Sequence, residues 1–428
     1  MSTIAPHQQA FKDTARDYEG CWFGTGCTKT RTCLYAVQEY EGSILVLAPK
    51  TTVQKKQWQY EAEVLKMKTP VVMSKETFRR DHQSLPKYDV LILEEAHYFL
   101  GVTPYTRQRN KVKIPKASQL YEAVQWYIKK YKPKRVILAT ATPNKTPMSV
   151  WAAAQILGYK WDFYKFRETF YFVLPMDRGY GQQIYAQKRD EASMERLAKA
   201  TQKIGKVLSL KDIRDVPDQV FMDKEFELTA AQKKALKDLP SLFSGDTSLR
   251  SKQHQIENGI LYRDIFNEKT GKVERTVTYF PNEKLDYIIE RAIEFKKMVI
   301  FASYTAQVDM IAKALEKEGK KVFILDSRTK DRKVIETQME ALESAYIVAQ
   351  ASVSSEWEAK SCPVMIFASL TNRNLDYIQG KGRIQRYDKV KKNIYIHLKT
   401  MGDNSIDEKW FNTIMSGKDF NEAIYEKE

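Results

Sequence analysis

The chain has few cysteines and few histidines. Its 428 residues include 5 histidines and 4 cysteines, at positions 21, 27, 33 and 362. The cysteines are too sparse for a disulfide framework, and they show no pairs at metal-ligand spacing. The scattered histidines offer no zinc site. These absences exclude a disulfide-stapled secreted domain and a Cys/His metal module, and they predict a reducing compartment, the cytoplasm.

Long apolar runs are also missing. The longest, such as Ile44–Ala48 and Val364–Ala368, are far shorter than the roughly 20 residues that a membrane-spanning helix needs. Residues 1–6 lack the charged and apolar regions of a secretory signal. We therefore expect no membrane segment and no secretion.

Acidic residues are in deficit. The chain has 70 Lys and Arg residues against 54 Asp and Glu residues, a formal net charge of +16. This excess indicates a polyanionic partner, with nucleic acid first and acidic membrane surfaces second. Hydrophobic residues at 43% and charged residues at 29% are otherwise typical of a globular protein. The length predicts two or three domains.

Short β-branched apolar segments alternate with longer helical patterns. Continuous rather than alternating apolar strands are buried on both faces, which is typical of a parallel sheet flanked by helices. The segments form two groups, and we therefore expect two α/β domains, over residues 1–218 and 219–428. The expected strands are 43–48, 90–93 and 135–139 in the first group, and 298–302, 321–325, 346–349, 364–368 and 393–398 in the second.

The middle of the chain, residues 161–280, differs in composition. It is rich in charge, with helical periodicity over 189–210 and 229–242 and few strand signals. We expect helical insertions here, and a domain boundary at Asp215–Asp218, where Pro217 interrupts any helix. The basic segment 107–116 is predicted to be a surface loop, either simply solvated or in contact with nucleic acid.

Residues 24–30 read Gly-Thr-Gly-Cys-Thr-Lys-Thr and precede a helical pattern. Glycines let such a loop fold tightly, so that backbone N–H groups point at phosphate oxygens, helped by the helix N-terminus. Lys29 would reach the β and γ phosphates of a nucleotide, and the Thr30 hydroxyl would bind magnesium. A plain glycine turn is the alternative. The remaining candidate nucleotide-binding residues of this loop are Thr25, Gly26, Cys27 and Thr28, the last at a position usually occupied by glycine.

Two carboxylates follow the predicted strand 90–93. Parallel sheets place ligands at the carboxyl ends of their strands. Glu94 is therefore a candidate magnesium ligand, partly through water, and Glu95 is a candidate base for the attacking water.

Residues 378–386 read Ile-Gln-Gly-Lys-Gly-Arg-Ile-Gln-Arg. A helix would place Gln379, Arg383 and Arg386 on one face. Guanidinium forks match phosphate oxygens. A solvated basic helix is the alternative, but the phosphate loop and the acidic pair upstream favour a nucleotide.

In this order, the segments resemble the motifs of superfamily 2 helicases and translocases. The phosphate loop resembles motif I, and Gln379–Arg386 resembles motif VI. Glu94–His97 resembles the DEAH box as an EEAH variant. Other resembling segments are Thr140–Pro143 (motif III), Leu47–Lys50 (motif Ia), Val299–Tyr304 (motif IV) and Pro6–Gln8, which contains the adenine-reading glutamine, Gln8. Within the superfamily, residues 216–232 and 252–259 are most similar to Swi/Snf-like and phage-encoded ATPases.

The resemblance implies two RecA-like parallel-sheet domains in tandem, with ATP and Mg²⁺ in the cleft between them. It implies that Arg383 and Arg386, with Gln379, approach the triphosphate from the second domain, while His97, Thr140 and Thr142 couple hydrolysis to domain movement. The implied nucleic-acid contacts are Pro49, Lys50, Thr51, Ser74 and Lys75 in the first domain, and Tyr304 and Thr305 in the second.

The implied activity is ATP-driven translocation or strand separation on DNA, single-stranded or branched, in replication, recombination or fork remodelling. RNA stays an alternative substrate, and the compartment would be the host cytoplasm if a phage encodes the chain. Three departures from the family pattern are Thr28, Glu94 and the lack of glycine in 351–356, where motif V is expected. They motivate two alternatives: a binding or annealing module with a decayed ATPase, and the motor subunit of a larger restriction or remodelling complex.

Overall fold

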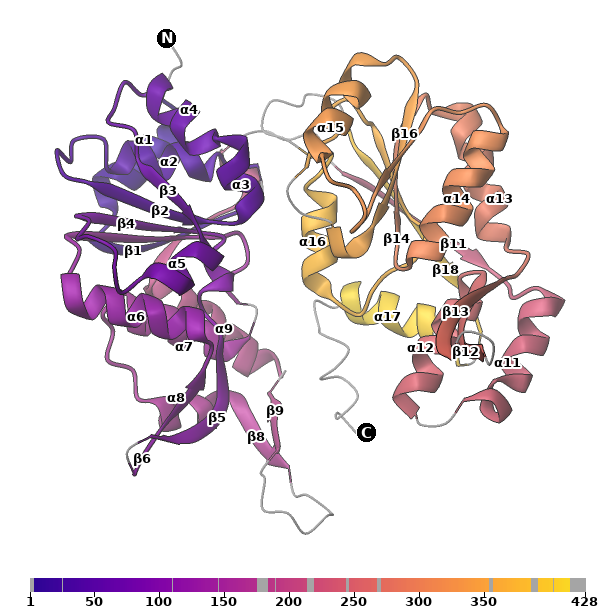
Figure 1. Cartoon of the computed structure of the whole chain (residues 1–428), viewed down its shortest axis with the longest axis horizontal. Helices are drawn as coiled ribbons and strands as arrows, with labels where there is room; N and C mark the ends of the chain where they lie inside the picture. Colours follow the sequence, from indigo (N-terminus) through magenta and orange to yellow (C-terminus); the bar gives the residue numbers. More distant parts are fainter. Residues whose placement is uncertain are drawn as a thin grey trace. The chain divides into compact units, whose positions relative to one another are not determined.

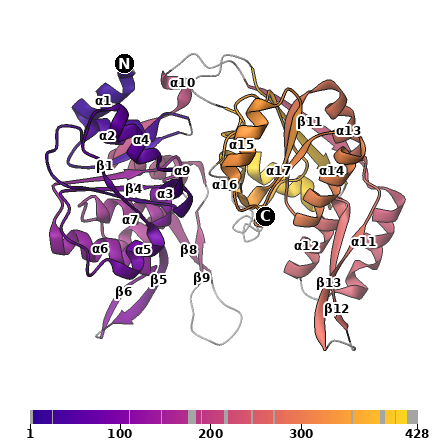
Figure 2. The same cartoon turned by 45° about the horizontal axis from the view of Figure 1, so that its top comes forward.

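The computed structural model divides the chain into two compact units, unit 1 (residues 1–215) and unit 2 (216–428) (Figures 1 and 2). Within the described part of the chain, every helix is too short or too polar to cross a lipid bilayer. The expected boundary between residues 218 and 219 stays a prediction, because Asp215–Asp218 lie outside the described residues. The structure describes residues 4–24, 26–109, 111–144, 146–174, 184–188, 190–213, 219–243, 246–267, 271–353, 357–385, 392–402 and 404–415.

Unit 1 is built on a parallel sheet in the order β10-β1-β7-β4-β2-β3. Its strands are β1 (Tyr18–Phe23), β2 (Ile44–Ala48), β3 (Val71–Ser74), β4 (Val90–Glu94), β7 (Arg135–Ala139) and β10 (Gly205–Leu208). Every residue of β2 and β7 is buried, as the continuous apolar runs predict.

Helices cover both faces of this sheet. Figure 1 shows α1, α2 and α4 on one side and α5 and α6 on the other. The helices of unit 1 are α1 (Pro6–Thr14), α2 (Lys29–Ala36), α3 (Lys50–Lys55), α4 (Gln57–Val64), α5 (Lys75–Asp81), α6 (Gln119–Tyr131), α7 (Pro147–Ile156), α8 (Phe163–Phe170), α9 (Glu191–Lys203) and α10 (Leu210–Ile213).

Unit 2 repeats the architecture, with a parallel sheet in the order β11-β18-β17-β14-β16-β15. Its strands are β11 (Val220–Phe226), β14 (Lys297–Ala302), β15 (Val322–Leu325), β16 (Ala345–Gln350), β17 (Val364–Phe367) and β18 (Ile394–Thr400). Its helices are α11 (Ala230–Leu242), α12 (Asp246–Glu257), α13 (Glu283–Glu294), α14 (Thr305–Lys317), α15 (Arg332–Ala341), α16 (Asn374–Lys381) and α17 (Ile406–Met415). The predicted fold class of two parallel-sheet α/β domains is confirmed.

The middle of the chain corrects two predictions. The described part of residues 161–280 contains six strands as well as helices, because β10 and β11 add edge strands to the two sheets and two hairpins are inserted. These hairpins are β8 (Tyr171–Leu174) with β9 (Ile184–Gln187) and β12 (Ile260–Asn267) with β13 (Lys272–Tyr279). The basic segment 107–116 is not a loop but belongs to the antiparallel hairpin of β5 (Val102–Arg109) and β6 (Val112–Ala117). Exposed edge strands and hairpins carry polar residues, and so they lack the continuous apolar runs of buried strands.

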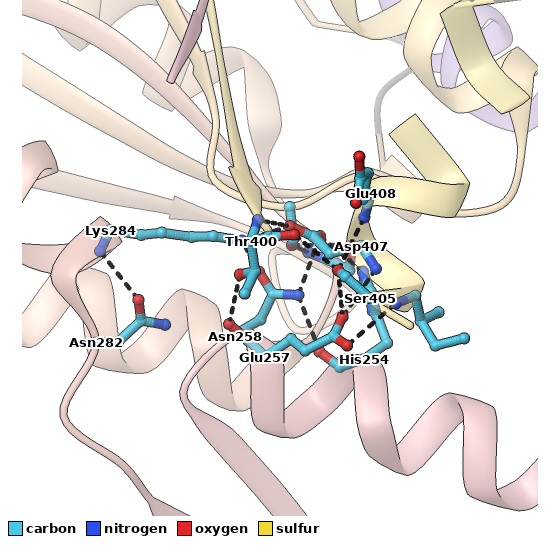
Figure 3. Close-up of polar contacts among 12 residues, drawn as sticks. His254, Glu257, Asn258, Asn282, Lys284, Thr400, Ser405, Asp407 and Glu408 are labelled. Carbon is cyan, nitrogen blue, oxygen red and sulfur yellow. Dashed lines mark hydrogen bonds and ion pairs between the residues drawn. The ribbon is translucent and has the colours of Figure 1, made fainter. Parts of the chain in front are cut away.

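A buried polar network joins α12, α13 and α17 in unit 2 (Figure 3). Asp407, 2% exposed, accepts hydrogen bonds from Lys284 Nζ at 2.6 Å and from His254 Nε2 at 3.1 Å. Glu257 accepts from the backbone N–H groups of Ile406 and Asp407 at 3.1 and 2.8 Å. Buried charges need such partners, because each would otherwise lose its hydration without compensation.

The network also positions Tyr304, the residue that precedes α14. The Tyr304 hydroxyl lies 2.7 Å from His254 Nδ1. Burial raises the pKa of Tyr304, so its hydroxyl stays protonated at neutral pH.

Burial alone would raise the pKa of Asp407, but Lys284 and His254 outweigh it and hold that pKa below its ordinary value of 3.8. Stability from this ionised carboxylate is therefore complete above the ordinary pKa, and it is lost as the pH falls through the lowered pKa.

We expect Lys284→Met to destabilise unit 2 by about 3–5 kcal/mol, because it leaves Asp407 buried beside fewer donors. In calorimetry of the whole chain at neutral pH, the thermal transition of unit 2 should then have a midpoint temperature about 6–20 °C lower than in the wild type. Lys313→Met, at an exposed position of α14, is the matched control and should change little. Equal midpoints for the two variants would contradict a stabilising role of the network.

Candidate functional site

The phosphate loop connects β1 to α2. Gly26 and Thr28 have left-handed backbones, with φ of 85° and 53°, and Thr25 lies outside the described residues. For threonine this conformation costs about 1–2 kcal/mol. It turns the chain so that α2 begins at Lys29. The loop therefore ends at the positive end of a helix, where anions bind favourably.

The side chain of Thr28 is bound by α1. Its Oγ1 accepts a hydrogen bond from Gln8 Nε2 at 3.0 Å and lies 3.2 Å from His7 Nε2. Gln8 is itself fixed, because its Oε1 accepts from the backbone N–H of Ala5 at 2.9 Å. A glycine at position 28 would have no side chain to make these contacts. The family resemblance identified Gln8 as an adenine-reading residue, whereas the contacts of Gln8 and His7 with Thr28 depend on the packing of α1 against the loop.

Lys29 lies against the end of β1. Its Nζ donates to the carbonyl oxygens of Phe23 and Gly24 at 3.1 and 3.2 Å. The ammonium group is thus held at the loop by two weak, exchangeable acceptors. Cys27 is buried, and burial raises the pKa of its thiol to about 11. At neutral pH this thiol is protonated and therefore a poor nucleophile.

The two carboxylates leave β4 in different directions. Glu94, its last residue, accepts a hydrogen bond from Trp58 Nε1 at 2.7 Å. Trp58 is 1% exposed, so the indole fixes that carboxylate rigidly. Glu95 has a left-handed backbone, with φ of 47°, which re-aims its side chain. Sequence reasoning missed Trp58, because it lies 36 residues from Glu94.

Glu95 belongs to a polar cluster with His97 and Thr140. Thr140 Oγ1 donates to Glu95 Oε2 at 3.3 Å, and His97 Nδ1 lies 3.1 Å from the same hydroxyl. The backbone N–H of Thr142 also donates to Thr140 Oγ1, at 3.2 Å. The structure therefore brings together Glu95 and all three predicted coupling residues.

The order of the strands in the sheet explains why Glu95 and Thr140 lie close together. β7 lies between β1 and β4, with Ala139 opposite both Cys21 and Glu94. Since all three strands are parallel, the loops that follow them lie at one carboxyl edge of the sheet. The phosphate loop, the acidic pair and Thr140 share that edge. The carboxylates of Glu94 and Glu95 and the Thr30 hydroxyl are oxygen donors of the kind that Mg²⁺ takes together with substrate phosphates.

The predicted nucleic-acid contacts of unit 1 lie farther along the same edge. Pro49, Lys50 and Thr51 follow β2, and Ser74 and Lys75 end β3 and begin α5, with Ala48 opposite Ser74. Ser74 Oγ caps α5 by accepting from the Thr77 N–H at 3.1 Å. Lys75 Nζ lies 3.3 Å from the centroid of the Tyr98 ring. Thr51 Oγ1 is buried and has no hydrogen-bond partner within the described ranges.

The motif VI segment corrects another prediction. Helix α16 ends at Lys381, with Gly382 as its C-cap, so Gln379 and Arg383 do not share one continuous helix. Arg383 is 9% exposed and donates from Nε to the Gln379 carbonyl and from Nη1 to the Trp357 carbonyl, both at 2.8 Å. The guanidinium thus donates hydrogen bonds to backbone carbonyls, including that of Gln379, which lies in the last turn of α16 and would otherwise lack a donor. Arg386 and residues 354–356 lie outside the described residues.

In unit 2, Tyr304 and Thr305 begin α14 directly after β14. This places both predicted nucleic-acid contacts at the carboxyl edge of the second sheet, with Tyr304 held by the buried network described above.

No family model and no curated protein sequence matches the chain. Its structure is similar to the Hef helicase domain of Pyrococcus furiosus, with a TM-score of 0.53 and 14% identity over 96% of this chain and 98% of that one. It also matches the SWI2/SNF2 ATPase core of Sulfolobus solfataricus, solved in complex with double-stranded DNA, with a TM-score of only 0.39 and 16% identity over 97% of this chain and 91% of that one. The likeness to the Hef domain, together with the two six-stranded parallel sheets, confirms the predicted fold of two tandem RecA-like domains.

Proposed function

We propose that the chain is an ATP-driven motor that moves along nucleic acid, with DNA as the first candidate substrate. The observation that carries this proposal is the hydrogen bond between Glu95 and Thr140 beside the phosphate loop. It joins a candidate water-activating base to the segment after the neighbouring strand. The fold supports the proposal through its similarity to a helicase domain over nearly the whole chain.

ATP would bind with its phosphates at the N-terminus of α2. Lys29 would exchange two backbone carbonyls for the β and γ phosphates, which are stronger acceptors for an ammonium group. Thr30 and Glu94 would hold Mg²⁺, which neutralises charge on the phosphates when bound. Glu95 would orient and deprotonate the attacking water, a role commonly worth about 10²–10⁴ in rate.

Movement would follow from the contacts of Glu95. A proton arriving at this carboxylate removes the charge that Thr140 Oγ1 donates to, and the hydroxyl can then reorient toward another acceptor. Thr142 and His97 share that hydroxyl, so the change reaches both loops. Unit 2 would supply Gln379, Arg383 and Arg386 on closure. An arginine brought to the transferred phosphate contributes about 10³–10⁵ in rate.

Nucleic acid would lie across the carboxyl edges of both sheets. The position of Lys50, Thr51 and Lys75 after β2 and β3 supports this, as does the net charge of +16. Backbone contacts of this kind are independent of base sequence and weaken with salt.

A second candidate is a nucleic-acid binding module with a decayed ATPase. It is favoured by Arg383, whose guanidinium is buried on carbonyls of its own unit, and by the strained Thr28. We propose replication or recombination proteins as partners of the motor. The other alternative is that the chain is the motor subunit of a larger restriction or remodelling complex.

The test is ATP hydrolysis by the purified chain with single-stranded, duplex, forked and four-way DNA, and with RNA. We expect stimulation by at least one polynucleotide. Lys29→Ala should abolish ATP binding, whereas Glu95→Gln should keep binding and lower kcat by about 10²–10⁴. Lys160→Ala and Glu41→Gln, at exposed positions of unit 1, are the matched controls. Hydrolysis that is equal with and without every polynucleotide excludes the motor, and full activity of Glu95→Gln excludes the assigned base.

A separate prediction concerns Trp58. Trp58→Phe keeps an aromatic ring in the core but removes the donor to Glu94. Loss of a partner that orients a metal-binding group typically costs 10–100-fold in metal affinity or activity. We expect the Mg²⁺ concentration for half-maximal hydrolysis to rise roughly tenfold or more, measured by magnesium titration at saturating ATP. Trp126→Phe, on α6, should titrate like the wild type. An unchanged midpoint in Trp58→Phe would remove Glu94 from the metal site.

A further inference from the structure

The hairpin formed by β5 and β6, residues 102–117, carries charge of one sign only. We call it the basic hairpin. It contains no acidic residue, and Figures 1 and 2 show it extending away from the parallel sheet of unit 1. Its five basic residues are all exposed: Arg107, Arg109, Lys111, Lys113 and Lys116.

These charges are almost uncompensated. Arg107 forms an ion pair with Glu122 at the start of α6. Within the described ranges, no carboxylate lies at ion-pair distance from the other four basic side chains of the hairpin. Like charges on neighbouring positions of a two-stranded sheet repel one another. A polyanion would relieve that repulsion.

The basic hairpin is nevertheless held rigidly at its base. Phe99 and Leu100, which precede it, are fully buried. The N–H of Ser118 donates to the Gly101 carbonyl at 2.7 Å, and Arg167 Nη1 of α8 donates to the Pro104 carbonyl at 3.3 Å. The charged positions are therefore displayed on a fixed scaffold, which lowers the entropic cost of binding.

We infer that the basic hairpin is a second nucleic-acid contact of unit 1, which binds the phosphate backbone outside the helicase-like motifs. This inference rests on the proposed function. Alternate strand residues such as Arg107 and Arg109 lie about 6.8 Å apart, so they can bind successive anionic groups of an extended polymer. An anionic membrane fits less well, because Val112 and Tyr105 are the only exposed large apolar side chains among the hairpin's described residues, and stable membrane binding needs an extended apolar face.

The position of the basic hairpin links this contact to the candidate hydrolytic site. β5 begins at Val102, a few residues after Glu95 and His97, and the connecting residues Phe99 and Leu100 are fully buried. A nucleic-acid strand bound at the basic hairpin would therefore contact a segment that is fixed by burial and is continuous in sequence with Glu95, which contacts Thr140. Binding there therefore contributes to the stimulation of hydrolysis by nucleic acid.

The test is a triple variant, Arg109→Gln, Lys113→Gln and Lys116→Gln. Arg107 stays, because its loss would leave Glu122 without a partner, and Lys111 stays, because it has a left-handed backbone. Each lost phosphate contact lowers the slope of log affinity against log salt by about 0.7 for single strands and 0.9 for duplex. We expect a slope smaller by about 2–3 and affinity at 0.1 M salt lower by roughly tenfold to a hundredfold. Basal ATP hydrolysis should be unchanged, while half-maximal stimulation needs about tenfold more polynucleotide.

The matched control removes three charges elsewhere, in Lys234→Gln, Lys237→Gln and Lys313→Gln at exposed positions of α11 and α14. Both triple variants should keep the wild-type unfolding midpoint. Equal salt slopes for the two variants would overturn the inference and leave the proposed function intact. Loss of binding to anionic vesicles, with nucleic-acid binding retained, would also overturn it. A wild-type chain that binds no polynucleotide would end both proposals.

Discussion

The parallel register of β1, β7 and β4 is the constraint on which the candidate site depends. Ala139 lies opposite both Cys21 and Glu94, so β4 and β7 end at the same level and β1 ends two residues farther on, at Phe23. Loops far apart in the chain therefore meet at one edge, with Lys29 after β1, Glu95 after β4 and Thr140 after β7. A slip of one residue in the β4–β7 pairing would turn the side chains of one strand to the opposite face of the sheet and would separate Glu95 from Thr140.

Two residues that depart from the family pattern have structural partners of their own. Thr28 accepts from Gln8 and lies beside His7, so α1 stabilises the backbone strain at this position. Glu94 is fixed by Trp58 from α4. These partners come from helices α1 and α4 and not from the phosphate loop. The longer carboxylate of Glu94 and the β-branched side chain of Thr28 are thus both fixed by hydrogen bonds from neighbouring helices.

Buried strands could be predicted from the sequence more accurately than exposed ones. The predicted buried strands lie within one or two residues of the observed ones, since continuous apolar runs define them, as at Arg135–Ala139. Buried β1 was missed, because Glu19 and Gly20 interrupt its apolar run. Edge strands such as β11 are exposed and charged, and so they gave no such signal. The helix considered over 378–386 ends at Lys381, because Gly380 and Gly382 lose more conformational freedom in a helix than other residues and so destabilise it. Partners such as His7 and Trp58 could not be found, because contacts across 21 or 36 residues depend on tertiary packing. The roles of the motif residues remain predictions.

The measurement that tests the central claim most directly is the number of ATP molecules hydrolysed per nucleotide travelled, in a Thr140→Val variant. Valine keeps the approximate shape of the side chain but removes the hydroxyl that joins Glu95, His97 and the Thr142 N–H. If this hydroxyl couples hydrolysis to movement, the variant should still hydrolyse ATP in the presence of nucleic acid but travel several-fold less far for each ATP. A variant that travels as far per ATP as the wild type would contradict the account.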